Sequence, residues 1–331
     1  MAMYHRARAG LARFQELSPT GRLALLALFA LALAALVGPG VWGQGALDQH
    51  VELRLGNPSL AHPLGTDSFG HDIFARLLMG ARWSLVGAAI VCLGTSALGF
   101  ALGTLAAFGN RAIDATIGRL IEALLALPGL VAALALTAVL GPSFPDLLLA
   151  LIVTSWPSSA RIFRALILRE RQAGYVEGAV ALGASRWRVA LRHILPNIFG
   201  PALVLATANF GGVILGLASL SFLGLGMQPP TPEWGRMIND ARPYFQRYPW
   251  QMVAPGLCIA LTVLAVNLSA DALRDRIAGQ RQRSTAGRSG KRRDGTQRRE
   301  GASALVRSGH ARFRRGAQQA ARSESIPGTR V

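Results

Sequence analysis

Residues 83–110 read WSLVGAAIVCLGTSALGFALGTLAAFGN, and these 28 positions hold no Asp, Glu, Lys or Arg. A helix needs about 20 mostly apolar residues to cross the hydrocarbon core of a bilayer. The glycines within the run would weaken a helix in water, but neighbouring helices satisfy freed backbone groups in a membrane. The run therefore predicts a membrane-spanning helix.

Charge-free runs of similar length recur along the chain, which is 51% hydrophobic and 16% charged. They cover Leu23–Leu47, Ala123–Pro145, Ile194–Pro232 and Tyr248–Ala270. A shorter run, Leu147–Ala160, reaches span length only if its helix continues through Arg161–Leu168, with the arginines snorkelling to the interface. Five long runs rarely occur together outside membranes, which argues against a large soluble helical core. We predict an all-α polytopic membrane protein with six transmembrane helices.

Arginines near the ends of the spans predict their orientation, because basic residues favour the cytoplasmic side. The positions before the first span carry Arg6, Arg8, Arg13 and Arg22, and residues 161–192 hold seven arginines. The connections Asp48–Arg82 and Pro229–Trp250 are mixed in charge, and Gly141–Asp146 has no basic residue. Together with a short inner turn at Arg111–Arg119, this pattern predicts that both termini are cytoplasmic.

The first segment has a second interpretation. A basic stretch followed by Leu23–Val37 is also typical of a signal peptide. The charge-free run is long for that, no good small-x-small cleavage site follows it, and Gly38-Pro39-Gly40 offers a helix end instead. A retained span is therefore favoured.

The net charge of +18 is concentrated at one end of the chain. Residues 279–331 hold 14 basic and 3 acidic residues, hence +11, and almost no aromatic residues. Such a segment is expected to be a disordered basic tail. Its alternative role is contact with anionic lipid headgroups or nucleic acid.

The sequence offers no chemistry of its own. It has no G-x-x-x-x-G-K-[ST] phosphate loop, and Cys92 and Cys258 lack metal-ligand spacing. No set of intramembrane carboxylates suggests an ion-coupled carrier, and the lone Glu122 is placed to pair with Arg119. We expect no catalytic residue, no cofactor and no metal.

The most informative segment is Tyr175–Asn197, which reads YVEGAVALGASRWRVALRHILPN. Tyr175–Leu182 favours a short helix that Gly183 can end in a left-handed conformation, and Ser185 can cap a second helix. In that second helix an apolar stripe is expected at positions i, i+3, i+4 and i+7, namely Trp187, Ala190, Leu191 and Ile194. Pro196 should then stop the helix. A compact hairpin of this kind can enter a groove on a partner.

These residues resemble the "EAA" loop of inner-membrane permeases of bacterial ABC importers, whose pattern is E-A-A-x3-G-x9-I-x-L-P. Here Gly178 replaces the first alanine and His193 replaces the isoleucine. The resemblance implies that the loop, within residues 170–196, docks a separate ATPase, with Glu177 in electrostatic contact and Gly183 at the bend. The implied coupling residues are Glu177, Gly178, Ala179, Ala181, Leu182, Gly183, Ala184, Arg186, Leu195 and Pro196.

The resemblance covers most of residues 20–277 and points to the "C"-type subunits of the dipeptide, oligopeptide and nickel branch. Its branch motif is carried by Gly65, Thr66, Asp67, Gly70, Asp72, Arg76 and Arg82, with His71 where an arginine is usual. Further similar positions are Asp114, Arg119, Glu122 and Pro128, then Leu220–Gly226, Pro229-Pro230, Trp234-Gly235 and Asn267–Asp275. Ala270 and Ala272 replace glycines of the last pattern.

The resemblance implies a multi-pass permease in a bacterial inner membrane with the type I importer fold, moving peptide-like or metal-chelate solutes inward. The implied segments are a cytoplasmic N-terminus 1–22, a first transmembrane helix 23–42, an extracytoplasmic segment 43–82, a permease core 83–278 and the tail 279–331. The implied partners are a second permease subunit in a heterodimer, two ATPase subunits, an extracytoplasmic solute-binding protein and membrane lipids, with no specific nucleic acid. The alternatives are a lipid- or nucleic-acid-binding protein that acts through its tail, and an ion-coupled secondary carrier.

Overall fold

The computed structural model describes residues 18–277, apart from the side chains of Gln44 and Arg186. The expectations for residues 1–17 and for the tail 279–331 lie outside the described part of the chain. Within it the secondary structure is helical, with one isolated β-bridge between Thr66 and Asp72. The helices are α2 (Pro19–Trp42), η1 (Gly43–Ala46), η2 (Val51–Leu53), α3 (Ile73–Phe108), α4 (Arg111–Leu125), α5 (Gly129–Leu140), α6 (Phe144–Arg171), α7 (Gly174–Ala181), α8 (Arg186–Val189), η3 (Ala190–Ile194), α9 (Leu195–Phe222), α10 (Trp234–Ala241), η4 (Arg242–Tyr244) and a last helix, Trp250–Ile277.

Four of these helices are long and apolar enough to cross a membrane: α2, α3, the continuous helix Trp187–Phe222 and the last helix. A fifth span is possible if α4 and α5 are counted as one broken span. Helix α6 has 28 residues, which is long enough. A run of serine, threonine and tryptophan side chains at 154–159 makes it less apolar than the other long helices.

Helix α3 is the centre of the bundle and contacts α2, α4, α6, α9 and α10. Glycines on α3 let α6 approach closely. A Cβ atom at Gly103 would lie 2.8 Å from the carbonyl oxygen of Ala160, and one at Gly99 would lie 2.8 Å from the backbone nitrogen of the same residue. Small residues are the usual means by which membrane helices pack backbone to backbone.

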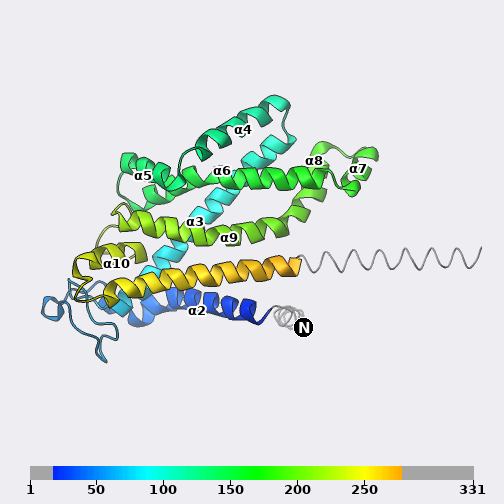
Figure 1. Ribbon diagram of the computed structural model, residues 1–331. Coiled ribbons are helices and arrows are strands. Elements are labelled where there is room, and N and C mark those ends of the chain that lie inside the picture. Colours follow the sequence, from blue (N-terminus) through cyan, green and yellow to red (C-terminus); the bar gives the residue numbers. More distant parts are fainter. Residues whose placement is uncertain (1–17, 278–331) are drawn as a thin grey trace, which may run out of the picture. The chain divides into compact units, whose positions relative to one another are not determined.

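The hairpin of α7 and α8 lies at one end of the bundle, and α5, α10 and residues 43–72 lie at the other (Figure 1). The start of α2 and the far end of the last helix lie at the same end as the hairpin. Direct packing supports this placement, because a Cβ atom at Gly21 would lie 2.5 Å from the Cβ of Ala272.

The third expected span, Ala123–Pro145, is wrong as a single straight helix. Helices α4 and α5 meet at an angle of 88°. Pro128 supplies no N–H, so α4 ends before it and α5 begins after it. The expected turn at Arg111–Arg119 is also wrong, because Asn110 caps α4 there by accepting a hydrogen bond from the backbone nitrogen of Ile113 at 2.9 Å.

The span predicted from Trp83–Asn110 is confirmed by α3, which begins ten residues before that run because Asp72 caps it. Two smaller expectations fail. Helix α2 does not end at Gly38-Pro39-Gly40 but continues through Pro39 to Trp42, whose ring packs edge-on against Phe74 with centroids 5.9 Å apart. Arg119 and Glu122 are both exposed and form no ion pair with each other. Asp114 instead pairs with Arg164 of α6.

Candidate functional site

The segment Gly174–Ile194 folds into a helical hairpin at one end of the bundle. Its first helix, α7, ends in two backbone hydrogen bonds: from Gly183 to the carbonyl of Val180 at 2.9 Å, and from Ala184 to that of Ala179 at 3.0 Å. Gly183 has φ of +83°. This is the Schellman arrangement, in which a glycine takes the left-handed conformation after the last helical turn. The sharp reversal at Gly183 agrees with the sequence-based expectation.

The outer surface of the hairpin carries several large apolar side chains that are exposed. Leu182 is 91% exposed, Trp187 is 70% exposed and Leu191 is 62% exposed. Val180 and Tyr175 are also exposed. A cluster of large exposed apolar side chains marks a surface that binds a partner or a membrane. We refer to Val180, Leu182, Trp187 and Leu191 as the hairpin tip.

The four residues of the expected apolar stripe therefore do not lie on one face of the second helix, and that prediction is wrong. Ala190 and Ile194 are 1% and 0% exposed, whereas Trp187 and Leu191 point away from the protein. The helix changes its winding at Ala190–Ile194, where it forms a π-helical turn. The spacing that assumes 3.6 residues per turn does not hold through such a turn.

Pro196 does not stop the helix, contrary to expectation. The chain continues from Trp187 to Phe222 as one helix, and Pro196 stands in the first turn of α9. The backbone nitrogen of Leu195 bonds to the carbonyl of Ala190, five residues back, rather than four. This wider turn accommodates the ring of Pro196, which lacks an N–H and crowds the preceding turn of a regular helix.

The inner side of the hairpin is fixed to three long helices. Val176, Val189 and Ile194 are buried against Ala107 of α3 and Ile167 of α6, together with Ile198 of α9. Arg171, the last residue of α6, donates a hydrogen bond to the carbonyl of Ala107 and lies 5.4 Å from the ring centre of Phe108. The guanidinium therefore caps the end of α3 beside the hairpin.

A polar set closes the other side of the hairpin. The Tyr175 hydroxyl donates to Glu170 Oε1 at 2.6 Å and accepts from Asn197 Nδ2 at 3.0 Å. Asn197 Nδ2 also donates to the carbonyl of His193 at 2.8 Å. A movement of the hairpin would thus be transmitted to α3, α6 and α9 together. Glu177 lines a hollow beside Arg171 and Phe108, and Gly178 has open space where a side chain would stand.

The branch-motif residues gather at the opposite end of the bundle, with one exception. Asp72 caps α3 by accepting from the backbone nitrogens of Phe74 and Ala75 at 2.7 and 3.1 Å, and its other oxygen lies 2.9 Å from His62 Nδ1. The buried Thr66 accepts from the Gly56 backbone nitrogen at 2.8 Å and receives a hydrogen bond from Gln251 at its carbonyl. Arg82 is exposed and lies outside this cluster.

Gly65 and Gly70 have positive φ angles of +73° and +84°. Added Cβ atoms there would run into the carbonyl oxygens of Gly56 and His50. Both glycines are therefore required by the fold of this loop.

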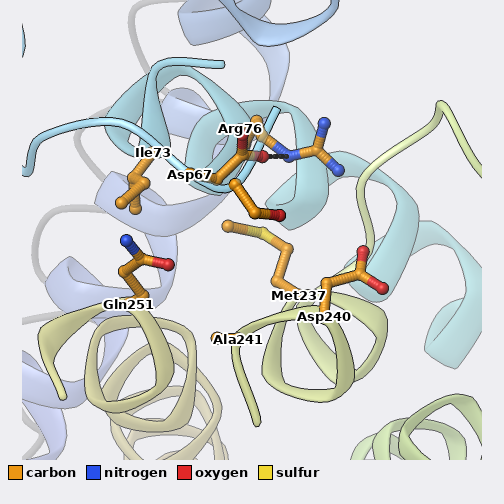
Figure 2. A pocket seen from close by; sticks show the side chains of 8 residues that line it. Asp67, Ile73, Arg76, Met237, Asp240, Ala241 and Gln251 are labelled. Atoms are coloured by element: carbon orange, nitrogen blue, oxygen red, sulfur yellow. Dashed lines mark ion pairs between the residues drawn. The ribbon is translucent and has the colours of Figure 1, made fainter. Parts of the chain in front are cut away.

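Asp67 and Arg76 form the charged centre of this cluster (Figure 2). Asp67 Oδ2 lies 2.9 Å from His71 Nδ1 and 3.5 Å from Arg76 Nε, and its other oxygen accepts from the backbone nitrogens of Phe69 and His71. Across a small cavity of about 20 Å³ lie Met237 and Asp240 of α10 and Gln251 of the last helix. The motif thus joins the loop before α3 to two later helices.

The pKa values of Asp67 and Asp240, the two carboxylates that line the small cavity, are shifted in opposite directions. Burial raises the pKa of Asp67, but the hydrogen bond with His71 and the charge of Arg76 outweigh it, so the net pKa is below the ordinary value. Burial also raises the pKa of Asp240, and here Arg236 and Arg76 offset it only in part, so the net pKa is above the ordinary value. Asp67 is therefore a stabilising anion in this cluster and Asp240 a costly one.

Sequence reasoning missed a buried polar link between α3 and α10. Glu233 is fully buried and caps α10 through the backbone nitrogens of Gly235 and Arg236, both at 3.1 Å. Ser84 of α3 donates to Glu233 at 2.8 Å, and the indole of Trp234 donates to the carbonyl of Leu77 at 3.1 Å. An acid directly before Trp-Gly is the one local signal of this cap.

The comparisons with known proteins agree with this architecture. Residues 99–281 match the family described as "Binding-protein-dependent transport system inner membrane component". The chain is 38% identical to the dipeptide transport system permease protein DppC of Alkalihalophilus pseudofirmus, over 76% of this chain and 83% of that protein. It is 40% identical to the di/tripeptide permease protein DppC of Pseudomonas aeruginosa, over 76% and 85%. It is 43% identical to the glutathione permease protein GsiD of Pectobacterium atrosepticum, over 66% and 72%. The chain belongs to the family of inner-membrane components of binding-protein-dependent transport systems.

Proposed function

We propose that this chain is a permease subunit of an ATP-driven importer of peptide-like solutes, and that the hairpin Gly174–Ile194 couples it to a separate ATPase. The observation that carries the proposal is the combination of an exposed apolar tip with a rigidly held base. Leu182 and Trp187 project from the surface. Val176 and Ile194 are buried among α3, α6 and α9. A surface that binds a partner and is fixed to three long helices can convey the partner's motion to the bundle.

Six membrane spans are the arrangement that fits this role: the four long apolar helices, the broken pair α4–α5, and α6. Helix α5 has 12 residues, about 18 Å, and cannot cross a bilayer of about 30 Å alone. Helix α6 measures about 42 Å and packs against α3, α4, α5 and α9, so neighbouring helices cover part of its hydroxyl-bearing stretch, of which Ser158 remains exposed.

The hairpin end of the bundle is proposed to face the cytoplasm. It carries the arginines of residues 161–192 and the start of α2. Basic residues close to span ends favour the cytoplasmic side. The loop before α3 and helix α10 would then face the side on which the solute-binding protein docks. Their buried hydrogen bonds hold this surface in a fixed conformation.

The proposed partners are a related second permease, two ATPase subunits and an extracytoplasmic solute-binding protein. The family description itself names binding-protein-dependent transport. The relatives are named for dipeptides, di- and tripeptides and glutathione, which supports a solute with peptide bonds. ATP binding would draw the two ATPases together and move the hairpins, and hydrolysis would reset them. Family membership favours this function over a tail-based lipid or nucleic-acid binder and over an ion-coupled carrier.

Copurification of the ATPase with this chain tests the proposal. The variant carrying Glu177→Lys and Gly183→Pro should lose most of the ATPase that the unaltered chain retains. The matched control is Glu52→Lys, which makes the same charge change on an exposed side chain at the opposite end of the bundle. Equal ATPase recovery from all three proteins would refute the docking role of the hairpin.

A further inference from the structure

A cavity of about 570 Å³ opens among α3, the α4–α5 break, α6 and α9. Hydroxyl and amide side chains from α3, α6 and α9 line this cavity. These polar residues are Thr95, Thr154, Ser155, Ser158, Ser159 and Asn209. None of the residues that line the cavity is Asp, Glu, Lys, Arg or His.

The polar groups of the cavity are available to a ligand. Thr95 and Thr154 donate to backbone carbonyls of their own helices, at 2.8 Å each, and keep their acceptor lone pairs. Ser159 is only 6% exposed as a residue, but its hydroxyl is not among the enclosed polar atoms that lack a partner, so it is accessible from the cavity that it lines. A hydroxyl in that position can bond to water or to a ligand.

The break between α4 and α5 opens on the same cavity. Leu127, Pro128 and Gly129 are among its lining residues. Helix ends leave backbone N–H and C=O groups without partners in the helix. At membrane depth such irregular backbone is tolerated only where it is buried in protein or lines a water-filled cavity. The break and the hydroxyl row are independent features, and both indicate a hydrated space.

We propose that this cavity is part of the solute path and binds uncharged, amide-bearing stretches of the solute, such as a peptide backbone. This inference rests on the proposed function and deepens it. Hydroxyl and carboxamide groups can both donate to and accept from a peptide group. Because no ionisable side chain lines the cavity, it would not select solutes by charge. Selectivity for charged side chains would be left to other parts of the assembly.

Thiol accessibility in the full transporter tests whether the cavity is hydrated. The test variant is Ser158→Cys, with both native cysteines replaced by serine. The matched control is Val153→Cys, about 7.5 Å away along α6, which is 41% exposed but does not line the cavity. A membrane-impermeant thiol reagent should modify the first variant at least tenfold faster than the second. Equal rates would overturn the proposal.

Solute binding is tested with dialanine, lysyl-alanine and aspartyl-alanine as probes. Dialanine delivered by the binding protein should slow modification of the Ser158→Cys thiol several-fold. A Ser158→Asp variant should lower the KM for lysyl-alanine relative to aspartyl-alanine, while ATPase copurification stays unchanged. If dialanine does not protect and the KM ratio does not move, the cavity is not the binding site.

The two proposals fail in different ways. ATP-dependent dialanine uptake with a Ser158→Cys thiol that is no more reactive than the control would leave the coupling role intact and remove the cavity proposal. Uptake that continues without the ATPase would remove the proposed function, whatever the thiol reactivity.

Discussion

The Arg164 guanidinium on α6 donates two hydrogen bonds to the Asp114 carboxylate on α4, at 2.6 Å from Nε and 2.7 Å from Nη2. Each side chain is about one third exposed, at 36% and 35%. A bidentate ion pair of this kind fixes the relative position of two helices better than a single hydrogen bond does. Here the pair holds α4 against the helix that leads into the hairpin.

The pair predicts a rescue by charge exchange. Arg164→Asp alone or Asp114→Arg alone should place like charges together and lower the thermal stability of the purified complex. The exchanged double variant should recover part of the loss. The coupling energy from a double-mutant cycle should be about 1 kcal/mol, because solvent screens a partly exposed pair. A coupling energy near zero would show that the contact does not hold α4.

Asp67 and Asp240 predict opposite effects of the same substitution. Asp67→Asn should destabilise the protein by about 2 kcal/mol near pH 7, because the buried Arg76 loses its charged partner. Asp240→Asn should be neutral or stabilising, because burial costs that carboxylate more than its arginine neighbours return. Thermal unfolding of both variants measures the difference. The reverse order would contradict the account of this cluster.

The same two residues predict a pH dependence. The folded-state pKa of Asp67 is below its ordinary value of 3.8, so its stabilisation is complete above that value and is lost as the pH falls through the folded pKa. The folded-state pKa of Asp240 is above its ordinary value, so its cost is relieved as the pH falls. The stability difference between Asp67→Asn and the unaltered protein should therefore shrink below about pH 4. A difference that is unchanged by acid would exclude this electrostatic origin.

Gly183 predicts a backbone effect that is separate from side-chain contact. A Cβ atom there meets open space, so Gly183→Ala adds only the strain of a left-handed alanine, about 1 kcal/mol. ATPase affinity should fall about fivefold as the hairpin reversal is disfavoured. The matched control is Gly178→Ala, which also meets open space but lies inside α7 and should favour that helix. Equal affinities for both variants would contradict the need for the reversal.

The sequence was sufficient to locate the long apolar helices and the reversal at Gly183, but it did not predict how each proline acts. Charge-free runs located the long helices because membrane burial requires them. Pro128 breaks a helix, whereas Pro39 and Pro196 lie within helices. The helix continues through Pro196 because a π-helical turn precedes it, and no pattern in the sequence predicted that turn. The links from Arg164 to Asp114 and from Ser84 to Glu233 join positions 50 and 149 residues apart, so local spacing could not reveal them.

A cytoplasmic ATPase can bind the hairpin only if the hairpin lies on the cytoplasmic side of the membrane. The most direct measurement places a single thiol at the tip through Leu182→Cys, with Cys92 and Cys258 replaced by serine, and treats vesicles of known orientation with an impermeant reagent. The account predicts labelling only in inside-out vesicles, and protection when the ATPase is bound. Labelling from the outer face, or labelling that the bound ATPase leaves unchanged, would contradict it.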